Sequence, residues 1–321
     1  PRGQLVATQA ARLERDSEEL AAVEAELLAH REALLGPHLE LDPAPQIEWY
    51  LGFWRSLGIG QFGWSPHPAV LAHVAALLAC DSARFLRELS VWGGVTLDVI
   101  PLVARTAPTL RSLELSLGPN VFDDASLHGL RGCTELRKLH LFSCDRVTAA
   151  GLAVGALGGL AALASLHLGH CAITDVGCAA LGGLTALRFL DLSSTNVTGA
   201  GLRELARLPQ LTTLDLSFLE LDDDDVQALL ALPNLTALGL AYSRRLTDRA
   251  IDLVCQLPAL TTLDLGGASI TPAGIDRLAQ LPELRELGLT SCSDEVRAHA
   301  ESFPHWYVDH RDCLEFDDEV Y

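Results

Sequence analysis

Two histidines and two aspartates recur along the chain at nearly constant intervals. His140, His167, Asp191 and Asp215 follow one another after 27, 24 and 24 residues. Imidazole nitrogens and carboxylate oxygens bind zinc or iron when they converge on one ion. This spacing instead predicts one side chain on each of four neighbouring parallel strands, and a row along strands roughly 4.8 Å apart tends to splay its ligands. We therefore keep a metal-dependent enzyme built on His140, His167 and Asp191 only as a remote alternative.

The C-terminal region holds a second group of possible metal ligands, namely His305, Asp309, His310 and Cys313. Their spacing permits a metal clip, but residues 306–308 alternate like a last strand, which favours a C-terminal cap. The acidic run at residues 222–225 stands in a turn before a helical segment, where carboxylates cap backbone amides and complement the helix dipole. It lacks the twelve-residue pattern of a calcium loop. Neither region is predicted to be a metal site.

The sequence carries no recognisable signature of catalysis. It has no GxSxG nucleophile motif, no phosphate-binding glycine loop that opens a helix, and no HExxH zinc motif. We predict neither a catalytic residue nor a cofactor, and therefore a protein that is not an enzyme. The 8 cysteines are too sparse for a disulfide scaffold and form no CxxC pair, which favours reduced, buried thiols and a cytoplasmic protein.

The dominant feature of the sequence is an internal repeat of the form LxxLxL. Its first leucines recur at intervals of 24 to 27 residues, which predicts about nine structural units of that length. These first leucines are Leu86, Leu110, Leu136, Leu163, Leu187, Leu211, Leu235, Leu260 and Leu284. Each unit continues with a polar turn and a segment whose leucines suit a short helix with an inward apolar stripe. Prolines such as Pro209 and Pro258 then end the helix just before the next strand.

These units resemble the leucine-rich repeat family, close to its cysteine-containing subtype, from about Leu86 to Leu289. The resemblance implies an α/β fold, a right-handed solenoid whose parallel strands line the concave face and whose helices cover the convex face. In this family, the ninth position of each unit holds a polar side chain or thiol that caps the neighbouring turn. That position is occupied here by Cys144, Cys171, Thr195, Ser243 and Cys292. Leu219 and Ala268 depart from the pattern and interrupt the predicted ladder.

Residues 1–85 do not follow the repeat and are expected to form an end cap over the first unit. A helix is predicted from Asp16 to about Leu35, followed by an aromatic cluster between Trp49 and Trp64 and a second helix over residues 68–80. Segments 1–6, 34–37 and 49–56 resemble the latter part of a repeat-companion domain found beside leucine-rich repeats in some bacterial proteins. That family has helical sequence before its Pro-Arg-Gly, and the chain contains no Met, so we expect native residues to have preceded Pro1.

Alternate residues of each predicted strand point to the concave face, so positions three, five and seven of the repeat should form its surface. Aromatic rings and carboxylates gather at these positions and at position eight, which suggests a contact site for a protein or peptide. The candidate binding residues are Trp92, His140, Phe142, His167, His170, Phe189, Asp191, Asp215, Phe218, Tyr242 and Asp264. In the alternative interpretation, several of these rings only cover strand ends.

A second function stays open, namely a substrate adaptor or regulatory subunit of a modifying or proteolytic enzyme. In such a protein the two caps would hold the catalytic partner while the solenoid selects the client. We divide the chain into a helical and aromatic N-terminal cap at residues 1–85, the solenoid at 86–292, and a C-terminal cap with an acidic tail at 293–321. The tail carries nine acids and two arginines, a net charge of −7, and could itself dock on a partner.

The net charge of −19 limits the classes of partner. Nucleic acid is not expected, because phosphate binding needs clustered basic residues and Lys138 is the only lysine. An acidic field with aromatic anchors favours a protein or peptide that presents a basic patch. Residues 147–174 lack charged side chains, but the repeat divides them into a helix, a turn and a strand, so no membrane span is predicted. The sequence does not set the oligomeric state.

Overall fold

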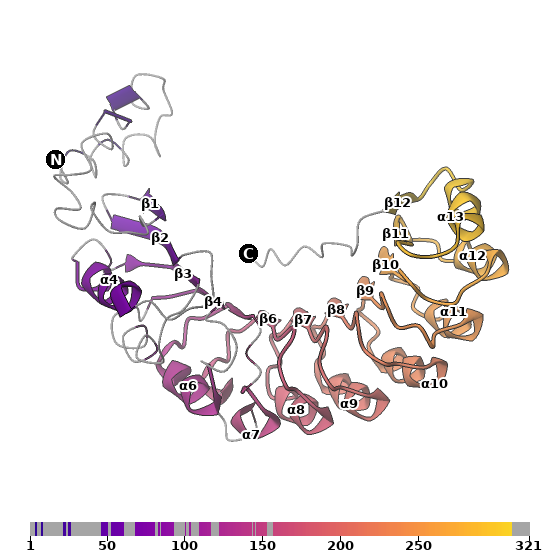
Figure 1. The fold of residues 1–321 in the computed structure, drawn as a ribbon, viewed down its shortest axis with the longest axis horizontal. Coiled ribbons are helices and arrows are strands. Elements are labelled where there is room, and N and C mark those ends of the chain that lie inside the picture. The colour runs from indigo at the N-terminus through magenta and orange to yellow at the C-terminus, as the bar shows by residue number, and fades with distance from the viewer. Residues whose placement is uncertain are drawn as a thin grey trace.

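The computed structural model describes residues 46–50, 53–60, 68–80, 83, 85–92, 100, 103, 109–116, 122–142, 144, 146–152 and 157–309, with a few isolated positions before residue 46. Within these ranges one sheet of 12 strands follows the order of the chain. The strands lie along the inner side of an arc and the helices along its outer side (Figure 1). The predicted parallel concave sheet and helical convex side are confirmed.

The strands are short, as expected of a repeat that gives each strand only a few residues before the next turn. They are β1 (Gln46–Tyr50), β2 (Phe53–Gly60), β3 (Glu88–Trp92), β4 (Ser112–Ser116), β5 (Lys138–Leu141), β6 (Ser165–His167), β7 (Phe189–Asp191), β8 (Thr213–Asp215), β9 (Ala237–Gly239), β10 (Thr262–Asp264), β11 (Glu286–Gly288) and β12 (Tyr307–Asp309). The pair β1 and β2 is antiparallel, and all later neighbours from β2 to β12 are parallel.

Short helices return the chain from one strand to the next. They are α4 (Pro68–Leu78), α6 (Asp124–Gly129), α7 (Ala149–Gly151), α8 (Asp175–Leu181), α9 (Gly199–Glu204), α10 (Asp223–Val226), α11 (Asp248–Val254), α12 (Pro272–Leu278) and α13 (Asp294–Glu301). Single 3₁₀ turns extend several of them, for example Leu205–Arg207 after α9. No helix within the described ranges is long and apolar enough to cross a membrane.

The repeat leucines form one continuous core between the sheet and the helices. The middle leucines of successive strands pair in register, as Leu166, Leu190 and Leu214 do, and all three are completely buried. Fully burying a leucine side chain stabilises a fold by roughly 1.5–3 kcal/mol. The core therefore fixes the register of every strand, because a slip of one residue would turn these leucines toward solvent.

The ninth position of the repeat links neighbouring turns. The Cys171 thiol donates to the carbonyl oxygen of Leu141, the Cys292 thiol to that of Leu265, and the Ser243 hydroxyl to that of Leu219. Thr195 differs, because its hydroxyl bonds the Leu192 carbonyl of its own turn. Where the ladder is interrupted, Leu219 and Ala268 are buried apolar residues instead.

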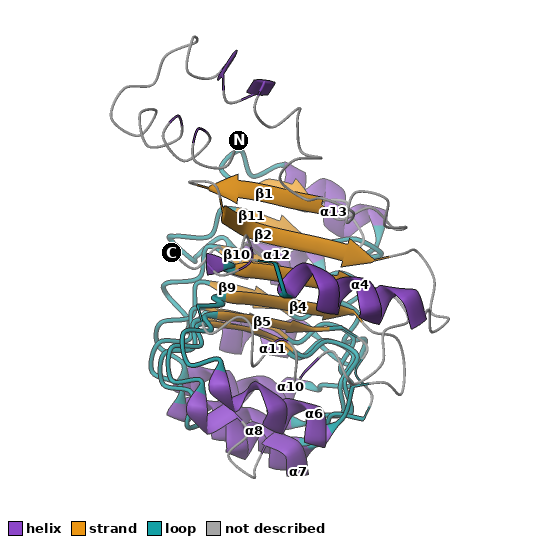
Figure 2. Cartoon of the chain, turned by 90° about the vertical axis from the view of Figure 1, so that its left-hand side faces the viewer, coloured by secondary structure: helices purple, strands orange, loops and turns teal. Residues whose placement is uncertain are grey.

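The sheet extends beyond both ends of the predicted repeats. β2 pairs in register with β3 and buries Leu57 and Ile59 in the same core, so among the described residues the antiparallel strands β1 and β2 form the N-terminal edge of the sheet. Figure 2 looks along the solenoid from this edge, with the predicted helix α4 beside β2. At the other end β12 follows the buried Trp306, as the alternation at residues 306–308 predicts.

Three predictions lie outside the described residues and stay predictions. They concern the helix from Asp16, the side chains of the aromatic cluster between Trp49 and Trp64, and the acidic tail after residue 309. The same holds for the resemblance to the repeat-companion domain and for the domain division as a whole.

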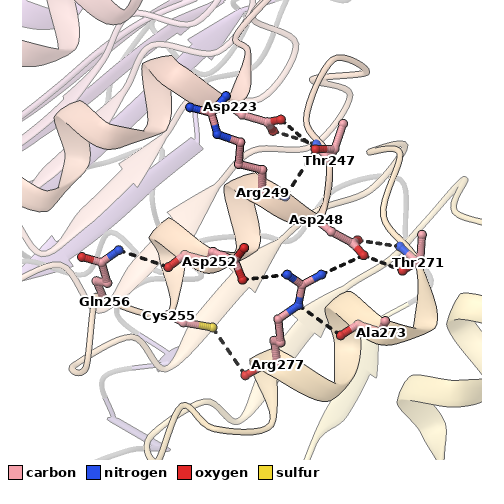
Figure 3. Close-up of polar contacts among 10 residues, drawn as sticks. All are labelled: Asp223, Thr247, Asp248, Arg249, Asp252, Cys255, Gln256, Thr271, Ala273 and Arg277. Carbon is pink, nitrogen blue, oxygen red and sulfur yellow. Dashed lines mark hydrogen bonds and ion pairs between the residues drawn. The ribbon is translucent and has the colours of Figure 1, made fainter.

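An aspartate at the start of one helix binds the threonine that caps the next helix. The carboxylate of Asp248 accepts the backbone N–H of Thr271 at 2.8 Å and its hydroxyl at 2.5 Å (Figure 3). Arg277 donates to Asp248 at 2.9 Å and to Asp252 at 2.7 Å. We call the contact between the aspartate carboxylate and the threonine of the next repeat the Asp–Thr clasp. It recurs as Asp124 with Thr148, Asp175 with Thr198, and Asp223 with Thr247.

The clasp explains a glycine that the sequence pattern alone does not. A Cβ atom on Gly274 would lie 2.5 Å from Oδ1 of Asp248, which is closer than atoms pack. The missing side chain therefore makes room for the carboxylate that joins α11 to α12. The convex side is thus held together by polar contacts between neighbouring repeats, in addition to the leucine core.

Candidate functional site

The fifth position of the repeat forms one row across the concave face. From β3 to β12 this row contains Ser90, Glu114, His140, His167, Asp191, Asp215, Gly239, Asp264, Gly288 and Asp309. The predicted placement of His140, His167, Asp191 and Asp215 on four neighbouring strands is therefore confirmed. The strand register brings them together even though 75 residues separate the first from the last.

The two histidines of this row stack instead of converging on a common point. The ring centroids of His140 and His167 are 4.4 Å apart and their planes differ by 16°. Among the described residues, no group of three histidine, cysteine, aspartate or glutamate side chains is placed to hold a metal ion. At the C-terminus, Asp309 is buried and His305 is exposed, and the other two residues of the possible metal clip lie outside the described ranges.

Five rings form what we call the imidazole–phenyl cluster, spread over β5, β6, β7 and their following turns. Its members are His140, Phe142, His167, His170 and Phe189. Phe142 meets His170 edge-on at 5.5 Å, and His167 stacks on Phe189 at 4.4 Å. Phe142 is 39% exposed, but Phe189 is only 4% exposed, so the expectation that Phe189 is an exposed contact ring is wrong. The stacked His167 ring covers Phe189, and the strand position of Phe189 alone does not predict this burial.

The imidazole–phenyl cluster is next to Asp191, the first of three aspartates that line the concave floor, the surface formed by the fifth positions of β7, β8 and β10. Nδ1 of His167 lies 3.8 Å from Oδ2 of Asp191. Burial acts to raise the pKa of Asp191, but the nearby His167 and hydrogen bonding from Ser193 outweigh it and hold that pKa below its ordinary value. Burial and the neighbouring His167 lower the pKa of His140 to about 4, so this imidazole is neutral at pH 7. The histidine side of the site therefore presents a neutral His140 ring stacked on His167.

Three aspartates line the floor beyond the imidazole–phenyl cluster. Each uses Oδ1 to accept the backbone N–H two residues later, from Ser193, Ser217 and Gly266 respectively, at 2.8–2.9 Å. Asp191 and Asp215 are half-buried, whereas Asp264 is 2% exposed. The expectation that Asp264 offers an exposed contact is therefore wrong. Burial, and next the charge of Asp191, raise the pKa of Asp215 to about 6.

The raised pKa of Asp215 predicts a pH-dependent effect of Asp215→Asn on stability. A carboxyl whose folded pKa exceeds the unfolded value of 3.8 stabilises the fold when protonated, and this stability is lost as the pH rises toward 6. Asparagine mimics the protonated form. We expect the variant to be more stable than wild type by about 1–2 kcal/mol at pH 7 and equally stable near pH 4.

Urea unfolding of both proteins at several pH values measures this difference, and the titration of His140 cancels in the comparison. A variant that is less stable than wild type at pH 7 would show that the Asp215 carboxylate is a structural group. The matched control is Asp222→Asn, which changes a carboxylate paired with Arg245 on the convex side and should show no such gain.

Two further rings form the Phe218–Tyr242 pair at the ends of β8 and β9. Their centroids are 4.5 Å apart and their planes differ by only 12°. Both residues have φ of 61°, and Gly267 takes the same left-handed turn position in the next repeat with φ of 72°. A bulky side chain in this conformation costs about 1 kcal/mol or more, which glycine would avoid. Phe218 is nevertheless 48% exposed, so core packing does not account for the ring.

Trp92 lies on β3, apart from the other candidate residues. Its Nε1 donates to Oε1 of Glu114 at 3.2 Å, and the ring covers Gly58 so closely that a Cβ there would lie 2.9 Å away. This tryptophan is held by contacts within the protein, in line with the alternative that some rings only cover strand ends. Ser217 is a further residue of this region that was not among the predicted contacts; it is 2% exposed, and its hydroxyl makes no hydrogen bond of ordinary geometry to a described residue. Its seventh position in the repeat was the available signal.

Comparisons with known proteins identify the repeat. Residues 161–221 match the family model described as leucine rich repeat. Among solved structures, internalin C2 from Listeria monocytogenes is 25% identical, with 70% of this chain and 87% of that one covered and a TM-score of 0.49. An internalin F structure from the same organism is 17% identical, with 80% and 92% covered and a TM-score of 0.40. No curated protein sequence matches the chain.

Proposed function

We propose, from the premise that this chain is a leucine-rich repeat protein, that it binds a protein or peptide partner through its concave face without catalysing a reaction. The observation that carries the proposal is the Phe218–Tyr242 pair. Its rings stand in the turns that follow β8 and β9, in a backbone conformation that disfavours large side chains, and Phe218 stays about half exposed. The same left-handed turn recurs in other repeats at His170, Ser194 and Ser291, so the turn does not itself require two large stacked rings, and their presence points to a function outside the packing of the protein itself.

The surroundings of the pair support a contact surface. Phe142 adds a second exposed ring, and the half-buried Asp191 and Asp215 lie on neighbouring strands between the two groups of rings. Interfaces draw most of their affinity from a few aromatic anchors in partly desolvated places, and preformed stacking lowers the entropy lost on binding. The carboxylates and the net charge of −19 support a partner with a basic patch. The buried free thiols Cys133, Cys178 and Cys292 support a cytoplasmic setting.

The test is affinity capture from the native cell with wild type and with a variant that carries Phe142→Ala, Phe218→Ala and Tyr242→Ala. We expect the triple variant to bind the captured partner at least about 100-fold more weakly, because each lost anchor removes a hot-spot contact. The control variant carries Phe85→Ala and Val176→Ala, which remove side chains that are 50% and 65% exposed away from these rings. It should bind as wild type does.

The outcome also separates the two functions that the sequence leaves open. A simple binder loses every partner in the triple variant, whereas an adaptor loses its client and keeps the protein that its ends hold. Equal capture by the wild type and the triple variant would refute recognition through the concave face. Circular dichroism of the variants checks that both remain folded.

A further inference from the structure

We infer that the partner presents an arginine side chain, whose guanidinium group pairs with Asp215 and stacks on the Phe218–Tyr242 pair. This inference rests on the proposed function and specifies the chemistry of the partner at one place on the concave face. In this inference the Asp215 carboxylate accepts hydrogen bonds from the guanidinium group, and the Phe218–Tyr242 rings stack on it. Both contacts form near the turn after β8.

The first support comes from the partners of the acidic side chains. On the convex side Asp222, Asp224 and Asp248 each form an ion pair with an arginine of the protein. On the concave floor Asp191 has His167 beside it. Asp215 has no lysine, arginine or histidine of the described residues within ion-pair distance; its Oδ1 accepts the backbone N–H of Ser217, and the nearby Ser217 side chain also lowers its pKa. A half-buried carboxylate in this state gains most from a cation supplied by another molecule.

The second support is Ser217, which follows Asp215 by two residues at the end of the strand. Its hydroxyl is buried and makes no hydrogen bond of ordinary geometry with a described residue, although it lies close enough to Asp215 to lower the pKa of that carboxyl. Buried polar groups are nearly always paired, and an unpaired hydroxyl destabilises a fold. In the preceding repeat, the carboxylate of Asp191 and the hydroxyl of Ser193 both lie within about 3 Å of the place where a Cβ on Gly169 would be. By repeat equivalence the Ser217 hydroxyl faces the same side as Asp215, where a bound donor can reach it once the rings adjust.

The third support is the shape of the neighbouring strand. At positions three, five and seven the repeat of β9 carries Ala237, Gly239 and Ala241, so this strand puts no side chain beyond a methyl group beside Asp215, and Gly239 and Ala241 are themselves buried. Phe218 and Tyr242 follow at the adjoining turns. A planar guanidinium stacks on aromatic faces and forks toward a carboxylate, which an ammonium group does not. The nearly parallel rings therefore favour arginine over lysine.

The charged groups that face Asp215 set the sign of the local field. Asp191 on β7 and Asp264 on β10 flank it, and both carboxylates act to raise its pKa. His167 lies one strand further and is next to Asp191. An arginine bound at this place lowers the pKa of Asp215 again, so formation of the complex near pH 6 should release a proton from this carboxyl. Binding should therefore strengthen as the pH rises from 5 to 7.

The experiment titrates nitrogen-15-labelled protein with the peptide acetyl-Gly-Arg-Gly-amide and with matched peptides that carry citrulline or lysine in place of arginine. The reporter is the amide of Ser217, which donates to Asp215. We expect the arginine peptide to shift this amide and that of Phe218, and to bind at least about tenfold more tightly than the neutral citrulline peptide. The lysine peptide should fall between the two.

Variants keep the result independent of folding. Asp215→Asn should lose the preference for arginine over citrulline while remaining at least as stable as wild type at pH 7, and Asp222→Asn should keep that preference. Equal binding of the arginine and citrulline peptides, lysine binding as tight as arginine, or shifts confined to the convex helices would each overturn the inference. If a captured partner needs the concave rings but its arginines can be replaced without loss, the proposed function stands and the arginine inference alone fails.

Discussion

Replacing Gly239 by arginine is expected to abolish binding of the arginine peptide and to weaken binding of the captured partner by at least about 30-fold. Gly239 is next to Asp215 in the sheet register, and Asp264 lies on its other side. Its φ is not positive, so the backbone permits a side chain, and because the glycine is buried the new side chain must extend toward Asp215 and the surface. The new guanidinium would pair with Asp215 from within the protein and occupy the place that we assign to the partner's arginine.

The control for this variant is Gly239→Gln, which adds a side chain of comparable length without the charge. At pH 7 we expect the arginine variant to be about 1–2 kcal/mol more stable to unfolding than the glutamine variant, because it neutralises a half-buried carboxylate. Thermal and urea unfolding measure the difference. An arginine variant that is less stable than the glutamine variant, or that binds the arginine peptide as wild type does, would contradict the account of Asp215.

Asp248→Ala is expected to lower the free energy of unfolding by about 2 kcal/mol. The substitution removes both hydrogen bonds of the Asp–Thr clasp to Thr271 and one of the two carboxylates that hold Arg277. Loss of a contact that orders a helix start costs about 0.5–2 kcal/mol, and hydrogen bonds to a charged group add to this. The matched control is Asp252→Ala, which removes only the other contact of Arg277 and should cost less than about 1 kcal/mol.

The location of the damage distinguishes the clasp from a general loss of stability. Repeats contact mainly their neighbours, so a weakened junction should uncouple the C-terminal units from the rest. Hydrogen exchange should therefore accelerate between Thr271 and Asp309 in Asp248→Ala and change little before β8. Uniform acceleration over the whole sheet, or equal effects of the two substitutions, would show that the clasp is not the element that joins α11 to α12.

The strand register is the part of the structure that the sequence predicts best. The leucine positions fix one face of each strand by burial, and the opposite face then follows by alternation. That is why the row from His140 to Asp215, the helix over residues 68–80 and the last strand at residues 306–308 are all confirmed. The ninth-position thiols follow for the same reason, since their slot faces the interior of the turn.

What the sequence does not predict depends on cover from neighbouring side chains. Phe189 and Asp264 occupy concave positions like their neighbours, yet both are buried by surrounding parts of the protein. A periodic sequence pattern gives the face on which a side chain lies but not how far its neighbours bury it. The strands β1 and β2 were not predicted, because residues 46–60 do not repeat the full leucine pattern. The Asp–Thr clasp joins residues 23 or 24 positions apart through an aspartate and a threonine that each read, locally, as ordinary helix caps.

The central claim is that the partner contacts the concave face at the Phe218–Tyr242 pair. The most direct measurement places the photoreactive amino acid p-benzoylphenylalanine at Phe218 in one protein and at the convex Val176 in another, and irradiates both in the native cell. We predict a specific covalent adduct from position 218, suppressed by Gly239→Arg, and none from position 176. Adducts of the same partner from position 176 alone would contradict recognition through the concave face.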